Sequence, residues 1–267
     1  MEKKWRLILD AKNDGFYNMA ADEALLLWYE KTGVPVLRIY GWNTPFLTLG
    51  YRQKPSLVLR DKELPFTLRL TGGAAILHHD EITYSFVCSP DALGLKRGVK
   101  ESYQKICQFL IYFYLKLGLK AQFAGDLIAA GLGDYGNFCF SSFEHFDLLV
   151  GGKKIGGNAQ ARRKNIIFQH GSIPVGLDFT AIENSIHGAS GLHEKTTCLR
   201  ELGVCEDFLR LQKLLFLSFH ETFRLKFQLS GFGDFENEAC RGLLASKYLT
   251  HGWKFKNEKT LLARQEN

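Results

Sequence analysis

The 267-residue chain lacks a long apolar run, a low-complexity segment and a C-x-x-C pair. Its most apolar stretch, ICQFLIYFYLKLG, is too short to cross a bilayer and contains a lysine. The N-terminal MEKKWRLILDAKNDG combines an early acidic residue with a short apolar run, so we expect neither a signal peptide nor an anchor. These absences predict a cytoplasmic protein that does not associate with a membrane.

Several kinds of site are also disfavoured. Without a C-x-x-C pair, the six cysteines indicate neither a zinc ribbon nor a redox dithiol, and most are expected to be reduced and buried. The sequence HHDE at 78–81 does not predict a metal site, because adjacent residues of a strand point to opposite faces. GLGDYG at 131–136 has the spacing of a dinucleotide-binding loop, but no helix pattern follows it. We therefore expect no metal and no dinucleotide.

The charge balance indicates the kind of partner. The net charge is +6, yet the longest basic run is ARRK at 161–164 and no nucleic-acid-binding motif is present. A mild excess of this size favours an acidic protein partner or an anionic small ligand over nucleic acid.

Hydrophobic periodicity predicts strands in most of the first two thirds of the chain. The segments 36–42 and 46–51 are predicted strands joined by a turn, and 66–70 and 82–87 form a second such pair. A helix is predicted from Asn18, as its N-cap, to Gly33, and a longer helix over 99–118.

The stretch VGGKKIGGNA lies between two further predicted strands, 146–150 and 164–178, and predicts an antiparallel hairpin that turns at the glycines. After residue 179 the pattern is mainly helical, with helices predicted over 206–223 and 236–249. No repeat or linker is present. The sequence therefore predicts an α+β fold in one domain, 1–267, with a mixed, largely antiparallel sheet, flanking helices and a helical part over 179–267. A separate helical tail is the alternative.

Three segments contain candidate site residues, and each has a simpler explanation. The loop after Arg69 can bring backbone N–H groups close to a phosphate or carboxylate, but Gly72-Gly73 also suits a plain hairpin turn. Cys139 lies in a loop rich in small residues, where a nearby cation would lower its pKa, although most such cysteines are structural. Lys153 and Lys154 between glycine pairs suit a surface hairpin or a close approach to a ligand.

Four stretches, in the right order, resemble the biotin/lipoate protein ligase superfamily: YNMAADEALL, VLRIYGWNTPFLTLGY, RLTGGAAILHHDEITYSF and GGKKIGGNAQARRKNIIFQHGSI. FCFSSFEHFDLLVGGKK is most similar to the superfamily's cysteine-dependent octanoyltransferases, and the chain is also similar to lipoate–protein ligases. The resemblance implies a biotin/lipoate ligase-like catalytic domain. It implies that Cys139 is the nucleophile and that Lys154 contacts the acyl carbonyl. The substrate-binding residues implied are Arg69, Gly72, Gly73, His78, Gly157 and His170.

The implied activity is octanoyl transfer in lipoate biosynthesis. Octanoyl would pass from acyl carrier protein through a Cys139 thioester to a lysine of a lipoyl domain or of the glycine cleavage H protein, without a cofactor. One alternative is a lipoate–protein ligase that uses ATP and Mg and proceeds through acyl-AMP. Another is a non-catalytic paralogue that binds an acyl carrier. The chain departs from the family pattern at Ala74 and Asn158, and a monomer is expected.

Overall fold

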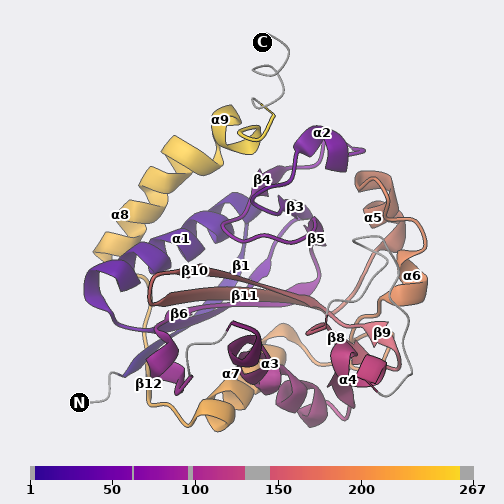
Figure 1. Cartoon of the computed structure of the whole chain (residues 1–267). Helices are drawn as coiled ribbons and strands as arrows, with labels where there is room; N and C mark the ends of the chain where they lie inside the picture. Colours follow the sequence, from indigo (N-terminus) through magenta and orange to yellow (C-terminus); the bar gives the residue numbers. More distant parts are fainter. Residues whose placement is uncertain (1–3, 62, 96–98, 130–144, 259–267) are drawn as a thin grey trace.

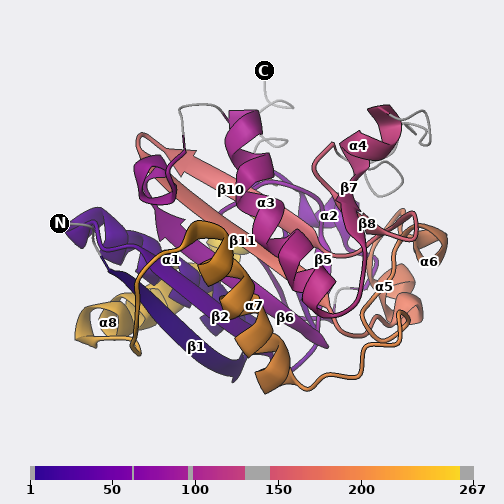
Figure 2. The same cartoon turned by 90° about the horizontal axis from the view of Figure 1, so that it is seen from below.

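A mixed sheet of six strands lies between two layers of helices (Figures 1 and 2) in a computed structural model that describes residues 4–61, 63–95, 99–129 and 145–258. In spatial order its strands are β10 (Gly157–Arg163), β11 (Ile166–Pro174), β6 (Glu81–Cys88), β2 (Val36–Trp42), β1 (Trp5–Asn13) and β12 (Phe227–Leu229). The pairs β10/β11, β11/β6 and β6/β2 are antiparallel, whereas β2/β1 and β1/β12 are parallel. The predicted mixed, largely antiparallel sheet is confirmed.

Strand β6 contributes side chains to the contacts on both faces of the main sheet. Its side chains at 82, 84, 86 and 88 belong to the apolar core that includes α3 (Val99–Lys116) and α7 (Phe208–Phe223). The side chains at 81, 83 and 85 lie on the opposite face, where Ser85 reaches α1 (Gly15–Thr32). This alternation follows from the two-residue repeat of a strand. On that face α1 packs against α8 (Asp234–Leu243) and η2 (Leu244–Tyr248).

Two small sheets complete the β structure. One has the order β4 (Phe66–Leu68), β3 (Phe46–Leu49) and β5 (Ile76–His78), and the other β7 (Ala121–Phe123), β8 (Leu148–Val150) and β9 (Lys153–Lys154). The turn between β8 and β9 contains Gly151 and Gly152, whose φ angles of 58° and 80° are those that glycine adopts without strain. The predicted turn at these glycines is confirmed, but the second strand of the hairpin is β9 and not the expected 164–178.

The predicted partners of two strands were wrong. We expected 146–150 to pair with 164–178, but β8 pairs with β9, and β11 pairs with β10 in the main sheet. Gly156, with φ of 93°, separates β9 from β10 and allows the chain to leave one sheet for the other. We also expected 66–70 to pair with 82–87. Instead β5 forms between them and, like β4, pairs with β3.

The helices follow the prediction with two differences. The first helix begins at Gly15, because the Asp14 side chain accepts a hydrogen bond from the backbone N–H of Tyr17 and caps it; Asn18 lies inside the helix and is buried. Its end at Gly33 is confirmed. Beyond residue 179 the chain is mainly helical, as expected, but β12 was missed because three residues are too short for a periodicity to appear.

The remaining helices are short. They are α2 (Pro55–Val58), η1 (Pro90–Leu93), α4 (Ala124–Ala129), α5 (Phe179–Ser185), α6 (Leu192–Lys195) and α9 (His251–Lys254). Three of them, α2, α5 and α6, lie at the site described below. In the part of the chain that the structure describes, no helix has both the length and the apolar character needed to cross a bilayer.

Candidate active site

A cavity of about 520 Å³ lies between the small sheet β4–β3–β5, strand β11 and helices α5 and α6. This volume is within the range of small-molecule sites, roughly 300–1,000 Å³. Part of its wall belongs to one apolar cluster, which supplies Val58, Leu77, Leu177, Ile182, Ile186 and Leu192. The polar part of the wall includes Thr48, Arg69, His78, Glu81, Lys154 and His170. The cavity thus offers an apolar lining together with three cations, Arg69, Lys154 and Lys195.

Most of the predicted site residues meet at this cavity. Its wall includes Arg69, Gly73, His78, Lys154, Gly157 and His170. Gly72 lies next to it, and the Gly72 carbonyl accepts a hydrogen bond of 2.6 Å from Arg69. Cys139 and the GLGDYG loop lie outside the described residues. The roles that the resemblance implies for all these residues stay predictions.

Lys154 and Lys153 have different surroundings although they are neighbours on β9. The Lys154 Nζ lies 2.7 Å from Asp147 Oδ2, and the Lys154 side chain, 31% exposed, lines the cavity. The Lys153 Nζ instead donates to the carbonyl of His193 at 2.8 Å, in an exposed position outside the cavity wall. Of these two lysines, only Lys154 is therefore placed to contact a ligand in the cavity.

Two glycines allow β10 and β11 to pack closely beside the cavity. A Cβ atom on Gly156 would lie 2.4 Å from the Ser172 carbonyl oxygen. A Cβ on Gly171 would lie 2.1 Å from the side-chain oxygen of Asn158, its partner in the strand register. That oxygen accepts a hydrogen bond of 2.7 Å from Tyr84. Asn158, a departure from the family pattern, is thus accommodated by the glycine opposite it.

Arg69 is a buried cation with uncharged partners. Its side chain donates to the hydroxyl of Thr71 at 3.1 Å, to the carbonyls of Gly72 and Ala74 at 2.6 and 2.8 Å, and to the carbonyl of Thr48 at 3.2 Å. Burial lowers the pKa of Arg69 to about 10, because the charged form loses its hydration. The guanidinium still carries its charge at neutral pH.

His78 lies between Thr48, which contacts Arg69, and the buried carboxylate of Glu81. The His78 Nδ1 lies 2.9 Å from Glu81 Oε1, and its Nε2 lies 2.7 Å from the Thr48 hydroxyl. The imidazole also stacks on Trp42, with centroids 3.9 Å apart. Burial alone would raise the pKa of Glu81, but His78 and the hydroxyl groups around the carboxyl outweigh it and hold that pKa below its ordinary value.

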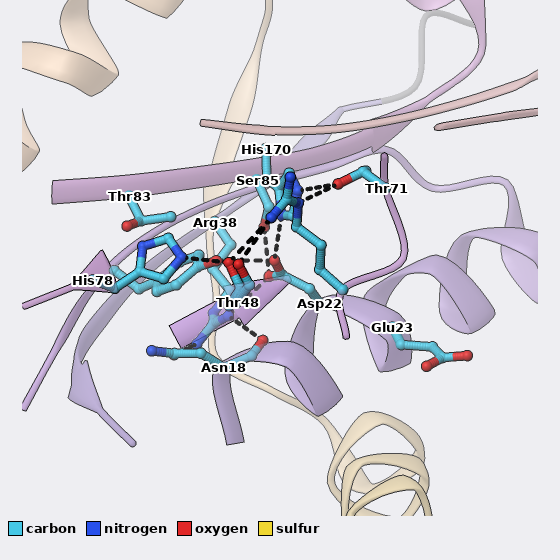
Figure 3. A network of polar contacts seen from close by, with 12 residues as sticks. Asn18, Asp22, Glu23, Arg38, Thr48, Thr71, His78, Thr83, Ser85 and His170 are labelled. Carbon is cyan, nitrogen blue, oxygen red and sulfur yellow. Dashed lines mark hydrogen bonds and ion pairs between the residues drawn. The ribbon is translucent and has the colours of Figure 1, made fainter. Parts of the chain in front are cut away.

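His170 is related in the same way to Asp22 (Figure 3). Its Nε2 lies 2.7 Å from the Thr71 hydroxyl, and its Nδ1 lies 3.7 Å from Asp22 Oδ2. Asp22 also accepts from Ser85 at 2.7 Å and from Arg38 at 2.9 Å. Burial lowers the pKa of His170 below its ordinary value and outweighs Asp22, which acts to raise that pKa, while the charge of Arg69 acts in the same direction as burial. We therefore assign His170 as neutral at pH 7.

The described cysteines do not contribute to this wall. They are Cys88, Cys107, Cys198, Cys205 and Cys240, all of them free, and only Cys205 is exposed. Burial raises the pKa of Cys107 to about 12 and that of Cys240 to about 11. The expectation of reduced and mostly buried thiols is confirmed for these five.

The sequence profile of the lipoyl protein ligase A/B catalytic domain matches residues 14–211. The chain belongs to this family. Octanoyltransferase LipM of Kyrpidia tusciae is 33% identical to it over 274 residues, which cover 94% of this chain and 98% of that protein. Octanoyltransferase LipM of Carboxydothermus hydrogenoformans is 34% identical over 268 residues, with the same coverage of 94% and 98%.

Solved structures show the same fold. A lipoate-protein ligase A bound with ATP has a TM-score of 0.79 and 21% identity, and the match covers 96% of this chain and all of that one, 100%. A putative lipoate protein ligase from T. acidophilum with bound lipoic acid has a TM-score of 0.77, 21% identity and coverage of 96% and 100%. The predicted biotin/lipoate ligase-like fold is confirmed for this lipoyl protein ligase family member.

The family's motifs did not single out several residues that hold the site together. Asp22, Thr48, Thr71, Glu81 and Asp147 all contact residues of the cavity wall. One signal was present in EITYSFV, where Glu81, Thr83 and Ser85 alternate with apolar residues. A strand with one polar face inside a protein indicates a buried polar network on that face.

Proposed function

We propose that this chain is an octanoyltransferase of lipoate biosynthesis, and hence an acyltransferase. The observation that supports this most strongly is its identity of 33% to 34%, over 94% of its length, to the two octanoyltransferases named above. The cavity suits such a substrate, because it combines apolar walls with Lys154 and Arg69. Burying eight acyl carbons in it is worth at most roughly 6 kcal/mol.

Transfer proceeds in two steps, with Cys139 as nucleophile. The Cys139 thiolate attacks the carbonyl carbon of the octanoyl thioester, a new C–S bond forms, and the carrier's sulfur leaves and takes up a proton. A lysine amine of the acceptor then attacks the enzyme thioester, forms an amide bond and loses a proton, while Cys139 is released. Exchange of one thioester for another is nearly isoenergetic and amide formation is downhill, so neither ATP nor a metal is required.

Lys154 is the cation that faces the acyl carbonyl. Its ammonium lies in the cavity wall, 2.7 Å from Asp147, and a nearby positive charge stabilises both the Cys139 thiolate and the oxyanion of each tetrahedral intermediate. Arg69, Gly73, His78 and His170 line the same cavity, in which the donor binds.

The acceptor is a protein of the lipoyl-domain class. A related archaeal lipoate protein ligase of T. acidophilum is described together with its E2 lipoyl domain. We propose acyl carrier protein as the donor and a lipoyl domain or the glycine cleavage H protein as the acceptor. The net charge of +6 suits acidic carriers.

The test is octanoyl transfer from octanoyl–acyl carrier protein to an apo lipoyl domain and to apo H protein, each with and without ATP and Mg²⁺. Mass spectrometry of the acceptor gives the readout. The proposal predicts an octanoylated acceptor lysine without ATP and no gain from adding ATP. Transfer of free lipoate or octanoate that depends on ATP, with none from the thioester, would show a ligase. Binding of acyl carrier protein with no transfer under either condition would show a non-catalytic paralogue.

A further inference from the structure

Two chains of polar side chains converge on Arg69. In one, Asp22 lies 3.7 Å from His170, which lies 2.7 Å from the Thr71 hydroxyl. That hydroxyl oxygen accepts from Arg69 Nε at 3.1 Å. Figure 3 shows His170 between Thr71 and Asp22.

The second chain repeats the first with different residues. Glu81 lies 2.9 Å from His78, which lies 2.7 Å from the Thr48 hydroxyl. The Thr48 hydroxyl oxygen is 3.4 Å from Arg69 Nη1. Both chains therefore have the order carboxylate, imidazole, threonine hydroxyl, guanidinium.

The carboxylates fix the direction of the hydrogen bonds. An ionised carboxylate only accepts, so Nδ1 of His78, 2.9 Å from Glu81, carries a proton, and Nδ1 of His170 is the nitrogen that faces Asp22 at 3.7 Å. In the neutral imidazole Nε2 is then the acceptor, and the threonine hydroxyl donates to it. This leaves the lone pairs of Thr48 and Thr71 for the N–H groups of Arg69, which has only donors.

Arg69 in turn holds the loop that follows it. Its Nη2 donates to the carbonyls of Gly72 and Ala74 at 2.6 and 2.8 Å. In a trans peptide the N–H of the next residue points away from that carbonyl, so the N–H groups of Gly73 and Ala75 point away from Arg69. Both of these residues line the cavity.

We propose that the chains Asp22–His170–Thr71 and Glu81–His78–Thr48 are positioning residues, which hold Arg69 and the loop 72–74 in the conformation that binds the acyl donor. They start on α1 and on β6 and cross to the small sheet that carries the loop, so they fix that loop relative to the main sheet. No carboxylate contacts Arg69 among the described residues, so its charge is not neutralised where it borders the cavity. This inference rests on the proposed function for the identity of the donor.

Isosteric substitutions separate positioning from packing. Thr48→Val and Thr71→Val each remove one hydroxyl, and Thr48→Ser and Thr71→Ser keep it. Thr67→Val is the matched control, because Thr67 is the register partner of Thr48 on β4, is buried, and its hydroxyl has no hydrogen-bond partner in the described chain. A general cost of placing valine in this small sheet would appear in all three valine variants.

The first readout is steady-state octanoyl transfer from octanoyl–acyl carrier protein. We expect each of Thr48→Val and Thr71→Val to raise the KM for the donor about threefold to tenfold, as for the loss of one net hydrogen bond, with a smaller change in kcat. The serine variants and Thr67→Val should keep the wild-type KM. If a valine variant fails to fold, His78→Asn, whose amide replaces Nδ1 but not Nε2, breaks the second chain one link further away and must raise the same KM.

The second readout is amide hydrogen exchange over residues 72–75, which needs no substrate. Exchange should be faster in Thr48→Val and Thr71→Val than in wild type, and unchanged in Thr67→Val. Equal KM and equal exchange in all three valine variants would overturn the positioning role. If the wild-type protein transfers no octanoyl group, the proposed function fails, and the exchange experiment still decides whether the two chains hold the loop.

Discussion

Lys153 and Lys154 differ in their partners rather than in their chemistry, so they form a natural pair for mutation. Lys154 lines the cavity and pairs with Asp147, whereas Lys153 donates to an exposed carbonyl. We expect Lys154→Met to lower kcat for octanoyl transfer by about 10²–10³, the usual effect of removing one oxyanion stabiliser. Lys153→Met removes the same charge one residue away and should stay within about twofold of wild type.

Two results of this comparison would contradict the role proposed for Lys154. If both substitutions lower kcat equally, the effect comes from the net charge of β9 and not from the position of Lys154. If Lys154→Met keeps wild-type kcat, the ammonium has no part in the transfer step.

Arg38 is a buried charge whose contribution to stability depends on its carboxylate partners. It is fully buried and donates to Asp22 at 2.9 Å and to Asp10 at 2.8 Å. We expect Asp22→Ala to lower the free energy of unfolding by about 3–5 kcal/mol, because the buried guanidinium loses a counter-ion. Urea unfolding measures this change.

An exposed ion pair provides the control for Asp22→Ala. Arg163 and Glu30 lie 3.6 Å apart with much of both side chains in solvent. Glu30→Ala should therefore cost less than about 1 kcal/mol. Equal effects of the two substitutions would mean that Arg38 does not depend on Asp22.

At the residue scale, motifs predicted which side chains meet but not what holds them. Lys154, Arg69, His78 and His170 were singled out by sequence, and all four line the cavity. Asp22 was not, because an acidic residue near the start of a helix is explained equally well by the helix dipole. Its contacts come from strands far along the chain, which a local pattern cannot show.

At the scale of secondary-structure elements, the register between β6 and β11 determines which polar side chains face the cavity. Thr83 is opposite Ser172, and Ser85 is opposite His170. A slip of either strand by one residue would turn these side chains toward α3 and α7 and bring apolar ones to the cavity. The register between β6 and β11 is thus specified by the apolar side chains on one face of the sheet and by the polar side chains on the other.

The glycines on either side of β9 provide a test at this scale. Gly152 and Gly156 both have positive φ, 80° and 93°. A Cβ on Gly152 would meet no atom of the described residues within 4 Å, whereas one on Gly156 would lie 2.4 Å from the Ser172 carbonyl oxygen. Gly152→Ala should cost about 1–2 kcal/mol of unfolding free energy, from backbone strain alone. Gly156→Ala should cost more and also raise the donor KM, because Gly156 lines the cavity.

Both variants are compared by urea unfolding and by steady-state kinetics. Equal losses of stability with an unchanged KM in both would contradict the close approach of Gly156 to β11.

Element identity was easier to predict from this sequence than element partnership. Strand β2 was predicted with its observed bounds, and the glycine turn between β8 and β9 was correct. The partners of β4 and β11 were wrong, because the short strand β5 and the polar edge strand β10 show little hydrophobic alternation. Pairing depends on contacts across sheets, and those are not encoded in any single segment.

The whole molecule should lose stability as the pH falls below about 6.5, in part through His170. Burial lowers the pKa of His170 below its ordinary value of 6.5. At a pH between the lowered pKa of His170 in the folded chain and its ordinary pKa of 6.5 in the unfolded chain, the unfolded chain binds a proton that the folded chain does not. The free energy of unfolding therefore decreases by up to ~1.4 kcal/mol for each unit by which the pH falls in this range. Asp22 and Glu81, whose pKa values lie below the ordinary 3.8 and 4.5, act only at lower pH.

Urea unfolding of wild type and His170→Gln from pH 7.5 to pH 5 measures this contribution. The wild-type curve should fall more steeply below pH 6.5 than that of the variant. Parallel curves would mean that His170 titrates alike in the folded and unfolded chains.

On the scale of the whole chain, four motifs in order predicted the fold and the polar side of the cavity, but not the helices that complete its wall. The first motif lies on α1 and the other three on strands, and their order indicated the lipoyl ligase-type fold that the comparisons confirm. The apolar wall, however, is formed with α5 and α6 from the C-terminal part, whose residues match no motif quoted from the sequence. The contribution of α5 and α6 to the cavity became visible only in the folded structure.

The central claim, a thioester on Cys139, is tested most directly by the intact mass of the protein after mixing with octanoyl–acyl carrier protein in the absence of ATP. Wild type and Cys139→Ala are compared, with Cys205→Ala as a control because Cys205 is exposed and lies outside the cavity wall. The account predicts one octanoyl adduct, released by hydroxylamine, in wild type and in Cys205→Ala, and none in Cys139→Ala. An adduct that persists in Cys139→Ala, or no adduct in any protein while lipoate and ATP yield acyl-AMP, would contradict it.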